Sequence, residues 1–377
     1  MKRIDKGLCV NSCAKFNARN SMKKVHNFSA GPCILPEEVI KQSAEAILEF
    51  DHMGLSLIEI SHRSKNFEAV MDEARALVKE ILGLKSNYEV LFLQGGATLG
   101  FYTAALNYMK EGGKAAYANT GVWAAAAIKE AKLVGNVDVI ADSSDKNHSY
   151  IPSFEVPSGY DYFHFTSNNT IYGTQYQSYP KCEVPMVCDM SSDIFSKQFD
   201  ANQFAMIYAG AQKNMGPAGT VLYIIDKEQL GKTGRKLPTY MDLQAHIEKD
   251  SMYNTPPVFA VYASMLTLRW IKKNGGLKGM EDRNRAKKDL FYNELDRNSL
   301  FHGHSEPASR SWMNPTFRLN DESMAAEFDK MWKDAGISGI AGHRSVGGYR
   351  ASMYNALPIE SVQVLVDVMK ELERSRG

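Results

Sequence analysis

A lysine and an aspartate 24 positions apart carry the clearest chemistry in the chain. Lys213 lies among small and apolar neighbours (208–217), where an amine is poorly solvated, has a lowered pKa and can form a Schiff base. Asp189 ends a short apolar run, a position that suits either a helix N-cap or a site residue. Taken singly, Lys213 could also be an ordinary surface lysine. Together the two residues fit a cofactor that needs an amine anchor and a carboxylate partner.

Pyridoxal phosphate needs these two groups and an anion site for its phosphate, and an aromatic ring often stacks on its pyridine. The Gly-rich element 94–98 lies between a predicted strand and a predicted helix, where free amides and the helix dipole bind anions. Trp123 begins another predicted helix and could stack on the ring or belong to the core. Two nucleotide motifs are excluded, because the glycine spacing in 95–100 is wrong for a dinucleotide and Asp226 replaces the glycine that a P-loop ending at 231–233 requires.

Short apolar runs alternate with helical patterns and predict the elements that position these residues. The predicted strands are 90–93, 115–118, 137–140, 160–166, 186–189, 206–209 and 220–225, and the predicted helices among them and before them are 37–50, 67–82, 99–108 and 122–133. Short strands buried on both faces are typical of a mainly parallel sheet, which binds ligands beyond the carboxyl ends of its strands. We therefore predict an α/β fold whose large domain has a mainly parallel seven-stranded sheet flanked by helices.

The pattern changes after about residue 280. A charged helix (282–295), a strand (313–319) and helices at 322–335 and 361–374 predict a smaller α+β C-terminal domain. The predicted organisation is a disordered extension at 1–21, an N-terminal segment at 22–36 that packs with the small domain, a large cofactor-binding domain at 37–279 and a small domain at 280–377. The extension is predicted because residues 1–21 hold five Lys or Arg against one Asp and lack the apolar core of a signal peptide.

Composition excludes several classes of protein. A chain of 377 residues with 44% hydrophobic and 23% charged residues is a globular protein of about two domains. The net charge of +1 argues against nucleic acid or a membrane surface as a partner, and no apolar run is long enough to cross a bilayer. Five scattered cysteines indicate reduced thiols and a cytoplasmic protein, and Cys9 and Cys13 lack the partner pair of a metal site, so we expect no metal.

Several further segments resemble the phosphoserine aminotransferase family, whose members are class V, fold-type I pyridoxal-phosphate enzymes. The similar segments occur in family order over residues 25–370 and are 26–32, 60–64, 94–98, 168–173, 189–192, 210–214, 253–257 and 342–352. The resemblance implies the fold-type I architecture and a homodimer with the site at the subunit interface. It also implies roles for individual residues, each at a position of this sequence that matches a family motif.

On the cofactor side, the resemblance implies that Lys213 forms the Schiff base and that Asp189 pairs with the pyridine nitrogen. Trp123 would stack on the ring and is the third residue placed in the catalytic group. The remaining implied cofactor contacts are Ala97, Thr98, Thr170 and Gln212, together with Asn254 and Thr255, which would reach the phosphate from the second subunit. Some family members have an arginine at the position of Thr98, so this residue supplies no basic substrate contact.

On the substrate side, an amino acid with a distal anion needs two cationic clamps, because guanidinium binds carboxylate and phosphate bidentately. The candidates are His62, Arg63, His343, Arg344 and Arg350. By resemblance, Arg350 takes the α-carboxylate and the other four surround the distal anion. Each His-Arg pair, taken alone, could be an ordinary pair of surface residues.

The implied reaction transfers the amino group between L-glutamate and 3-phosphohydroxypyruvate to give O-phospho-L-serine and 2-oxoglutarate, a step of serine biosynthesis. The sequence leaves open whether 4-phosphohydroxythreonine, a substrate of pyridoxine biosynthesis, is also used. The main alternative is a class V aminotransferase of the serine/alanine–glyoxylate type, although an uncharged acceptor leaves the cationic residues unpaired. A cysteine desulfurase needs a cysteine on a mobile loop, whereas Cys182 and Cys188 lie before or within a predicted strand. A non-catalytic anion-binding protein is the remaining alternative.

Overall fold

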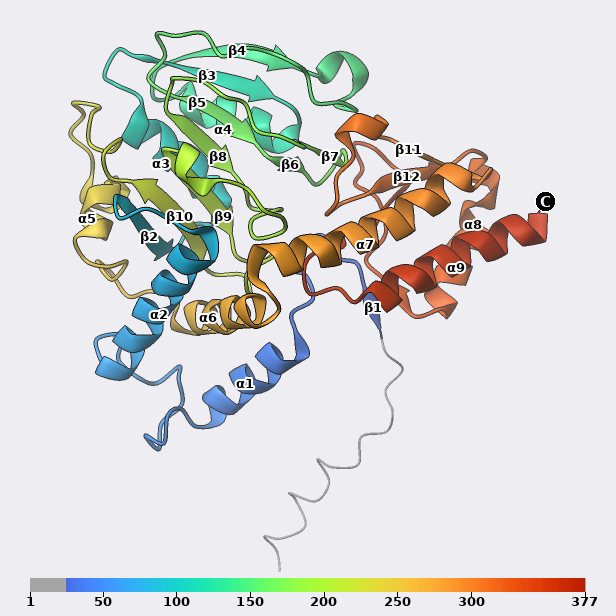
Figure 1. The fold of residues 1–377 in the computed structure, drawn as a ribbon, viewed down its shortest axis with the longest axis horizontal. Helices are drawn as coiled ribbons and strands as arrows, with labels where there is room; N and C mark the ends of the chain where they lie inside the picture. Colours follow the sequence, from blue (N-terminus) through green and yellow to red (C-terminus); the bar gives the residue numbers. More distant parts are fainter. Residues whose placement is uncertain (1–24, 377) are drawn as a thin grey trace, which may run out of the picture.

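In the computed structural model, which describes residues 25–376, the predicted strands assemble into one seven-stranded sheet (Figure 1). The strands lie in the order β2 (Tyr88–Leu93), β10 (Val221–Asp226), β9 (Met206–Gly210), β8 (Met186–Asp189), β5 (Phe163–Thr166), β3 (Lys114–Asn119) and β4 (Asn136–Asp142). β10 is antiparallel to both of its neighbours, and the pairs from β9 to β4 are parallel. The prediction of a mainly parallel sheet is therefore confirmed.

Helices cover both faces of this sheet, because its central strands are buried on both sides. One face packs against α3 (Gly96–Tyr108) and α4 (Val122–Ala131), and the other face packs against α2 (Lys65–Leu82) and α6 (Val258–Lys273). α1 (Glu37–Leu48) lies against α6, and the short α5 (Leu243–Ile247) lies near β2. The edge strand β4 is largely exposed, in keeping with its alternating sequence.

Local sequence explains where these helices begin and end. α2 begins after Ser64, whose hydroxyl accepts a hydrogen bond from the Phe67 amide at 3.3 Å, and it ends at Gly83, whose φ of 59° closes the helix. The predicted strands of the large sheet and the predicted helices beside them match the observed ones to within a few residues. The helix predicted at 282–295 begins earlier, at Gly276, and the one predicted at 322–335 begins with a 3₁₀ turn at Glu322–Met324. α5, α6 and the strands of two or three residues outside this sheet were not predicted.

The smaller part of the chain has its own apolar core. Its sheet has the order β11 (Phe301–Gly303), β12 (Thr316–Leu319) and β14 (Tyr349–Arg350), and it packs with α8 (Ala325–Asp334) and α9 (Ile359–Arg376). β1 (His26–Asn27) pairs in parallel with β13 (Ile337–Ser338), so the N-terminal segment joins this part of the molecule. β6 (Asn168–Asn169) and β7 (Thr174–Gln175) form a hairpin on the large part of the molecule, on the side that faces β11 and β12 (Figure 1).

The 22-residue helix α7 (Gly276–Arg297) runs from the large part into the small one (Figure 1). Met280 near its start belongs to the core of the large part, and Phe291 belongs to the core of the small part. The domain boundaries remain predictions. The extension predicted at residues 1–21 and the metal site judged absent at Cys9 and Cys13 lie outside the described residues.

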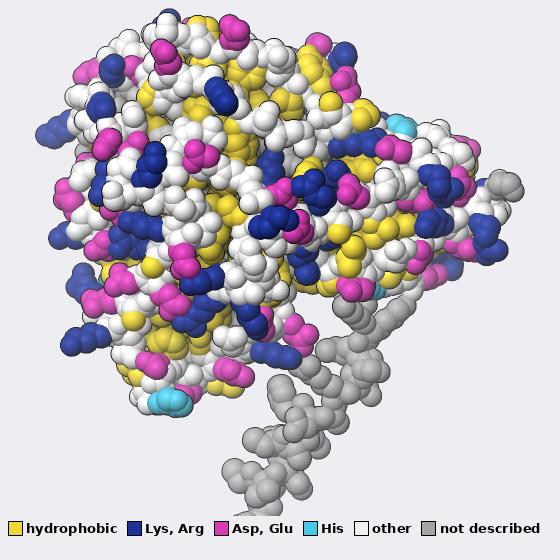
Figure 2. Space-filling model, in the orientation of Figure 1, with side chains coloured by type: hydrophobic (Ala, Val, Ile, Leu, Met, Phe, Trp, Pro, Cys, Tyr) yellow, Lys and Arg dark blue, Asp and Glu magenta, His cyan; other side chains and the backbone are white. Residues whose placement is uncertain are grey.

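No helix in the described part of the chain combines the length and the apolarity that a membrane span requires. On the face drawn in Figure 2, Lys and Arg side chains are interspersed with Asp and Glu side chains.

The contact between α3 and β9 gives a test of the packing. A Cβ atom on Gly100 would lie 2.8 Å from the ring of Tyr208, which is fully buried and whose hydroxyl is hydrogen-bonded to His164. We expect Gly100→Ala to lower the free energy of unfolding by ~1–3 kcal/mol, because this ring cannot move aside. Urea denaturation measures the change. Helix propensity alone predicts the opposite sign, a gain of up to ~1 kcal/mol, so a stabilised variant would contradict this packing.

Candidate active site

A cavity of about 350 Å³ lies where the large and small parts of the molecule meet. Asp189 and Lys213 both line it, as does the first turn of α3. The cavity therefore lies beyond the carboxyl ends of β8 and β9, where a parallel sheet is expected to bind its ligand.

Asp189 is the last residue of β8, and its side chain is 5% exposed. Its Oδ1 accepts a hydrogen bond of 2.9 Å from the Ser191 amide, so the turn that follows the strand orients the carboxylate. Burial raises the pKa of Asp189, while the positive charge of Lys213 and the hydrogen bond from Ser191 act in the opposite direction. A nearby positive charge therefore favours the ionised form of this carboxylate.

Lys213 follows β9 by three residues and points toward the indole of Trp123, with 5.9 Å between its Nζ and the ring centroid. Burial lowers the pKa of the Lys213 amine, and the charge of Asp189 partly offsets this effect. The N-terminal segment covers its backbone, since the Cys33 amide donates to the Gln212 carbonyl at 3.1 Å and a Cβ on Gly31 would lie 3.5 Å from Lys213 Cγ. An amine held in this way favours its neutral, nucleophilic form.

The turn between β2 and α3 forms the anion-binding end of the cavity. Gly95 and Gly96 have φ values of 102° and 64°, and a Cβ on Gly95 would overlap the side chain of Leu99. These two glycines allow the 13-residue helix α3 to begin directly at the cavity wall, where Gly96, Ala97 and Thr98 line the space. Amides in the first turn of a helix have no partner within it, so they are available to a phosphate.

Thr170 connects two walls of the cavity. Its hydroxyl accepts a hydrogen bond of 3.2 Å from Trp123 Nε1, and its carbonyl accepts one of 3.0 Å from Arg350 Nη1. Arg350 Nε is buried without a hydrogen-bond partner, which suits a guanidinium that awaits an anionic ligand. Burial, followed by the nearby charges of Arg350 and Arg344, lowers the pKa of His343 at the same wall.

Nine of the predicted site residues line this one cavity: Ala97, Thr98, Trp123, Thr170, Asp189, Gln212, Lys213, His343 and Arg350. Five others do not: His62, Arg63, Asn254, Thr255 and Arg344. Asn254 Nδ2 instead donates to Gln94 Oε1 at 2.9 Å, next to the turn that precedes α3. Within one chain, the structure thus brings together seven of the nine predicted cofactor residues and two of the five predicted substrate residues.

Sequence reasoning assigned no role to several residues that line the cavity: Ala30, Gly31, Gly96, Phe101, Ile171 and Ser191. The motif that contains Ala30 and Gly31 was recognised as part of the resemblance, but nothing in its pattern indicated a contact with Lys213. That contact joins segments about 180 residues apart and is visible only in the folded chain.

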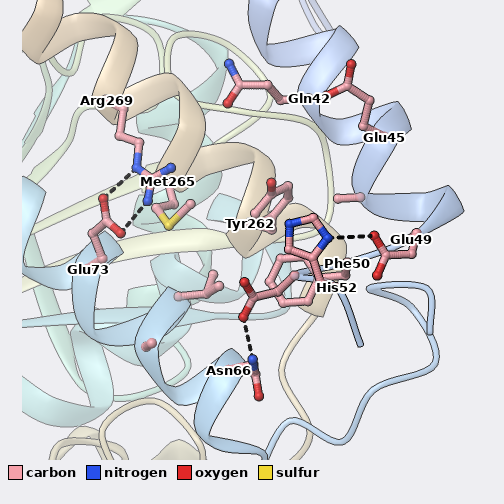
Figure 3. Close-up of a pocket in the computed structure, with 14 residues that line it drawn as sticks. Gln42, Glu45, Glu49, Phe50, His52, Asn66, Glu73, Tyr262, Met265 and Arg269 are labelled. Carbon is pink, nitrogen blue, oxygen red and sulfur yellow. Dashed lines mark hydrogen bonds and ion pairs between the residues drawn. The ribbon is translucent and has the colours of Figure 1, made fainter. Parts of the chain in front are cut away.

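A larger cavity of about 520 Å³ lies between α1, α2 and α6 (Figure 3), yet it lacks the required groups. None of its lining residues is a lysine, and Arg269 is paired with Glu73, with 2.5 Å between Nε and Oε1. Asn66 likewise donates to Asp51. We therefore assign the chemistry to the smaller cavity.

The cysteines in the described part of the chain do not support thiolate chemistry. Burial raises the pKa of Cys188, which lies within β8, well above its usual value, and burial also raises the pKa of Cys182. A desulfurase needs a reactive thiolate, which an apolar surrounding disfavours.

The family follows from comparison with known proteins. The model of the family described as "Aminotransferase class-V" matches residues 25–365. The chain belongs to the class-V aminotransferases. A phosphoserine aminotransferase from Flavobacterium psychrophilum is 62% identical over 354 residues, which are 93% of this chain and 99% of that protein.

Two solved structures resemble this class-V aminotransferase over nearly their whole length. Phosphoserine aminotransferase from Bacillus circulans subsp. alkalophilus has a TM-score of 0.91 and 42% identity, with 94% of this chain and 100% of the other covered. The PLP-bound phosphoserine aminotransferase from Trichomonas vaginalis has a TM-score of 0.87 and 33% identity, with 92% and 100% covered. The predicted fold class and the predicted class of enzyme are confirmed.

The electrostatic coupling in this aminotransferase can be tested in the cofactor-free protein. Asp189 raises the pKa of Lys213, so Asp189→Asn should lower that pKa further and shift the pH midpoint of Lys213 modification downward. An amine-selective reagent, followed by mass spectrometry of the peptide that contains Lys213, measures this midpoint. Asp367→Asn on the exposed face of α9 is the matched control and should leave the midpoint unchanged. An unchanged or raised midpoint in Asp189→Asn would contradict the coupling.

Proposed function

We propose that this class-V aminotransferase transfers the amino group between L-glutamate and 3-phosphohydroxypyruvate, giving O-phospho-L-serine and 2-oxoglutarate, with pyridoxal 5′-phosphate as its cofactor. One observation carries the proposal: a single cavity holds the Lys213 amine and the Asp189 carboxylate together with His343 and Arg350. The high identity to proteins named phosphoserine aminotransferase over nearly the whole chain supports it.

The residues of the cavity fit pyridoxal phosphate in three separate respects. Lys213 offers an amine whose pKa burial lowers, Asp189 offers a buried carboxylate for the pyridine nitrogen, and the first turn of α3 offers amides for the phosphate. Trp123, Thr98, Thr170 and Gln212 complete the set of residues that would hold the cofactor. When bound, pyridoxal phosphate supplies an aldehyde carbon and an electron-withdrawing ring.

The chain's own residues then perform the proton transfers and the binding. A neutral Lys213 Nζ can accept the proton from the Cα of the amino acid and later donate it to the cofactor carbon. Burial lowers the pKa of Lys213 and so favours the neutral form that a general base requires. Burial raises the pKa of Asp189 and a nearby positive charge lowers it, so the Asp189 carboxylate would favour a protonated pyridine nitrogen. The segment at Ala30 and Gly31 lines the cavity beside Lys213 and helps to exclude water.

Charge at the other wall favours a substrate with two anionic groups. Arg350 has a free Nε for the α-carboxylate, and His343 lies at the same wall for the distal group. Burial lowers the pKa of His343, so a phosphate beside it should raise that pKa again and share a proton with it. An acceptor without a distal anion gains none of this interaction, which argues against glyoxylate.

The residues that do not reach the cavity support a homodimer whose partner subunit completes the site. His62 and Arg63 lie in the segment between α1 and α2, next to a stretch with many exposed apolar side chains. These exposed residues are Ile40, Ile47, Leu48, Met53, Leu55 and Ile58, and exposure of Leu48 reaches 83%. A cluster of this kind is typical of a surface that a partner covers. In this arrangement His62 and Arg63, with Asn254 and Thr255, act on the cavity of the other subunit.

A steady-state acceptor panel with L-glutamate as the donor tests the proposed reaction. We expect kcat/KM for 3-phosphohydroxypyruvate to exceed that for hydroxypyruvate and for glyoxylate by ~10²-fold or more, because the cationic residues are otherwise unpaired. A separate assay with 4-phosphohydroxythreonine as the amino donor and 2-oxoglutarate as the acceptor decides whether the longer substrate is also used. Equal or faster turnover of glyoxylate would refute the proposed acceptor and favour the glyoxylate type.

Co-expression of two variants, each with a different defect in the site, tests the role of the partner subunit. Lys213→Ala removes the amine, and Arg63→Ala weakens the binding of the distal anion. If Arg63 acts across the interface, a mixed dimer has one intact site, and a statistical mixture should regain about a quarter of the wild-type activity. Each variant expressed alone is the control. No recovery in a verified mixed dimer would show that Arg63 serves its own chain.

A further inference from the structure

The loop 342–348 brings His343 to the cavity from the small part of the molecule. The loop is the tip of a tight hairpin: Ala341 and Tyr349 form a β-bridge, and the Gly342 amide donates to the Gly348 carbonyl at 2.9 Å. A Cβ on Gly342 would overlap the carbonyl of Gly347, so the two arms of the hairpin approach each other closely. The base of the loop is therefore well defined by its backbone.

Within the tip, the His343 carbonyl accepts hydrogen bonds from the Val346 and Gly347 amides at 2.9 and 2.7 Å, so His343 and Val346 belong to one turn. One apolar side chain packs this turn against the opposite wall. Among residues 341–348, Val346 alone is buried, with 4% of its surface exposed. It packs with Ile171 and Tyr172 in a three-residue apolar cluster that is separate from the three larger cores. Ile171 and Tyr172 directly follow Thr170, which bonds to Trp123 and Arg350. This contact thus joins the loop to the segment of Thr170, which forms the cavity wall next to Trp123.

The surface that receives Val346 is fixed by contacts of its own. The ring of Tyr172 lies between those of His148 and His304, at centroid distances of 4.8 and 5.9 Å. The Gly173 amide donates to the Asn169 carbonyl at 2.9 Å, and the Gly173 carbonyl accepts from Ser311 at 2.8 Å. The wall therefore does not depend on Val346 for its position, whereas the loop tip does.

We propose that Val346 is a positioning residue that determines specificity for the distal anion, because its contact with Ile171 and Tyr172 holds His343 in the cavity. The inference rests on the proposed function and adds to it a residue that touches neither substrate nor cofactor. Hydrogen bonds and ion pairs to a phosphate weaken steeply with distance and angle, so a small displacement of the loop tip reduces binding of this group. Contacts at Lys213 and Asp189 are unaffected, because they lie on other elements.

Two substitutions in the holoenzyme test this inference. Val346→Ala removes most of the apolar contact, and Val346→Thr keeps the shape but buries a hydroxyl against apolar neighbours. The measured quantity is the ratio of kcat/KM for 3-phosphohydroxypyruvate to kcat/KM for hydroxypyruvate. We expect the ratio to fall about tenfold in Val346→Ala and in the same direction in Val346→Thr, through a higher KM for the phosphorylated acceptor at little change in kcat.

Val362→Ala is the matched control. Val362 is a fully buried valine of α9 in the core of the small part, so its loss lowers stability without touching the loop. We expect this variant to unfold at a lower temperature and to keep the wild-type ratio. An unchanged ratio in both folded Val346 variants, or an equal fall in Val362→Ala, would overturn the inference. If the wild-type enzyme itself does not prefer the phosphorylated acceptor, the proposed function fails together with the inference, so the two failures are distinguishable.

Discussion

Desolvation of one amine and one carboxylate governs the rest of the site. Burial raises the pKa of Asp189 and lowers that of Lys213, so each group moves toward its neutral form unless an opposite charge lies nearby. The two residues therefore support each other in the free protein, and a cationic ring nitrogen can replace Lys213 as the partner of Asp189. Taking both groups out of water thus favours the roles that we propose for them, a nucleophilic amine at Lys213 and a partner for a cation at Asp189.

The sheet topology makes this arrangement possible. Parallel strands β8 and β9 end at the same edge of the sheet, so residues 24 positions apart arrive in one cavity. Glycines at 95 and 96 let α3 start at this edge, and Gly100 lets the helix lie directly on Tyr208. The wall of the cavity at the first turn of α3 is therefore set by packing between α3 and the sheet.

Buried polar contacts hold the two parts of the molecule together beside the site. Lys287 of α7 is fully buried, and its amine donates to the carbonyls of Met353 and Tyr354 at 2.8 and 2.6 Å. Asn355 connects the same segment to Asn214, the residue after Lys213, since the backbone amide of Asn355 donates to Asn214 Oδ1 at 3.0 Å. Satisfied buried polar groups of this kind select one arrangement of the chain, and they place Arg350 relative to Lys213.

The sequence by itself determined the strands of the large sheet and most of the long helices, because apolar periodicity reports local burial. It also indicated that Asp189 and Lys213 share a site, because residues at the carboxyl ends of parallel strands converge whatever the details of packing. The other predicted residues that line the cavity were assigned largely through the resemblance of their motifs to a known family. Only the tertiary structure decided that Ala30 and Gly31 line the cavity beside Lys213, that Val346 packs against Ile171 and Tyr172, and that His62, Arg63 and Arg344 do not line the cavity of their own chain. Such contacts join segments far apart in the chain, and they depend on the relative placement of whole elements, which no local pattern of residues encodes.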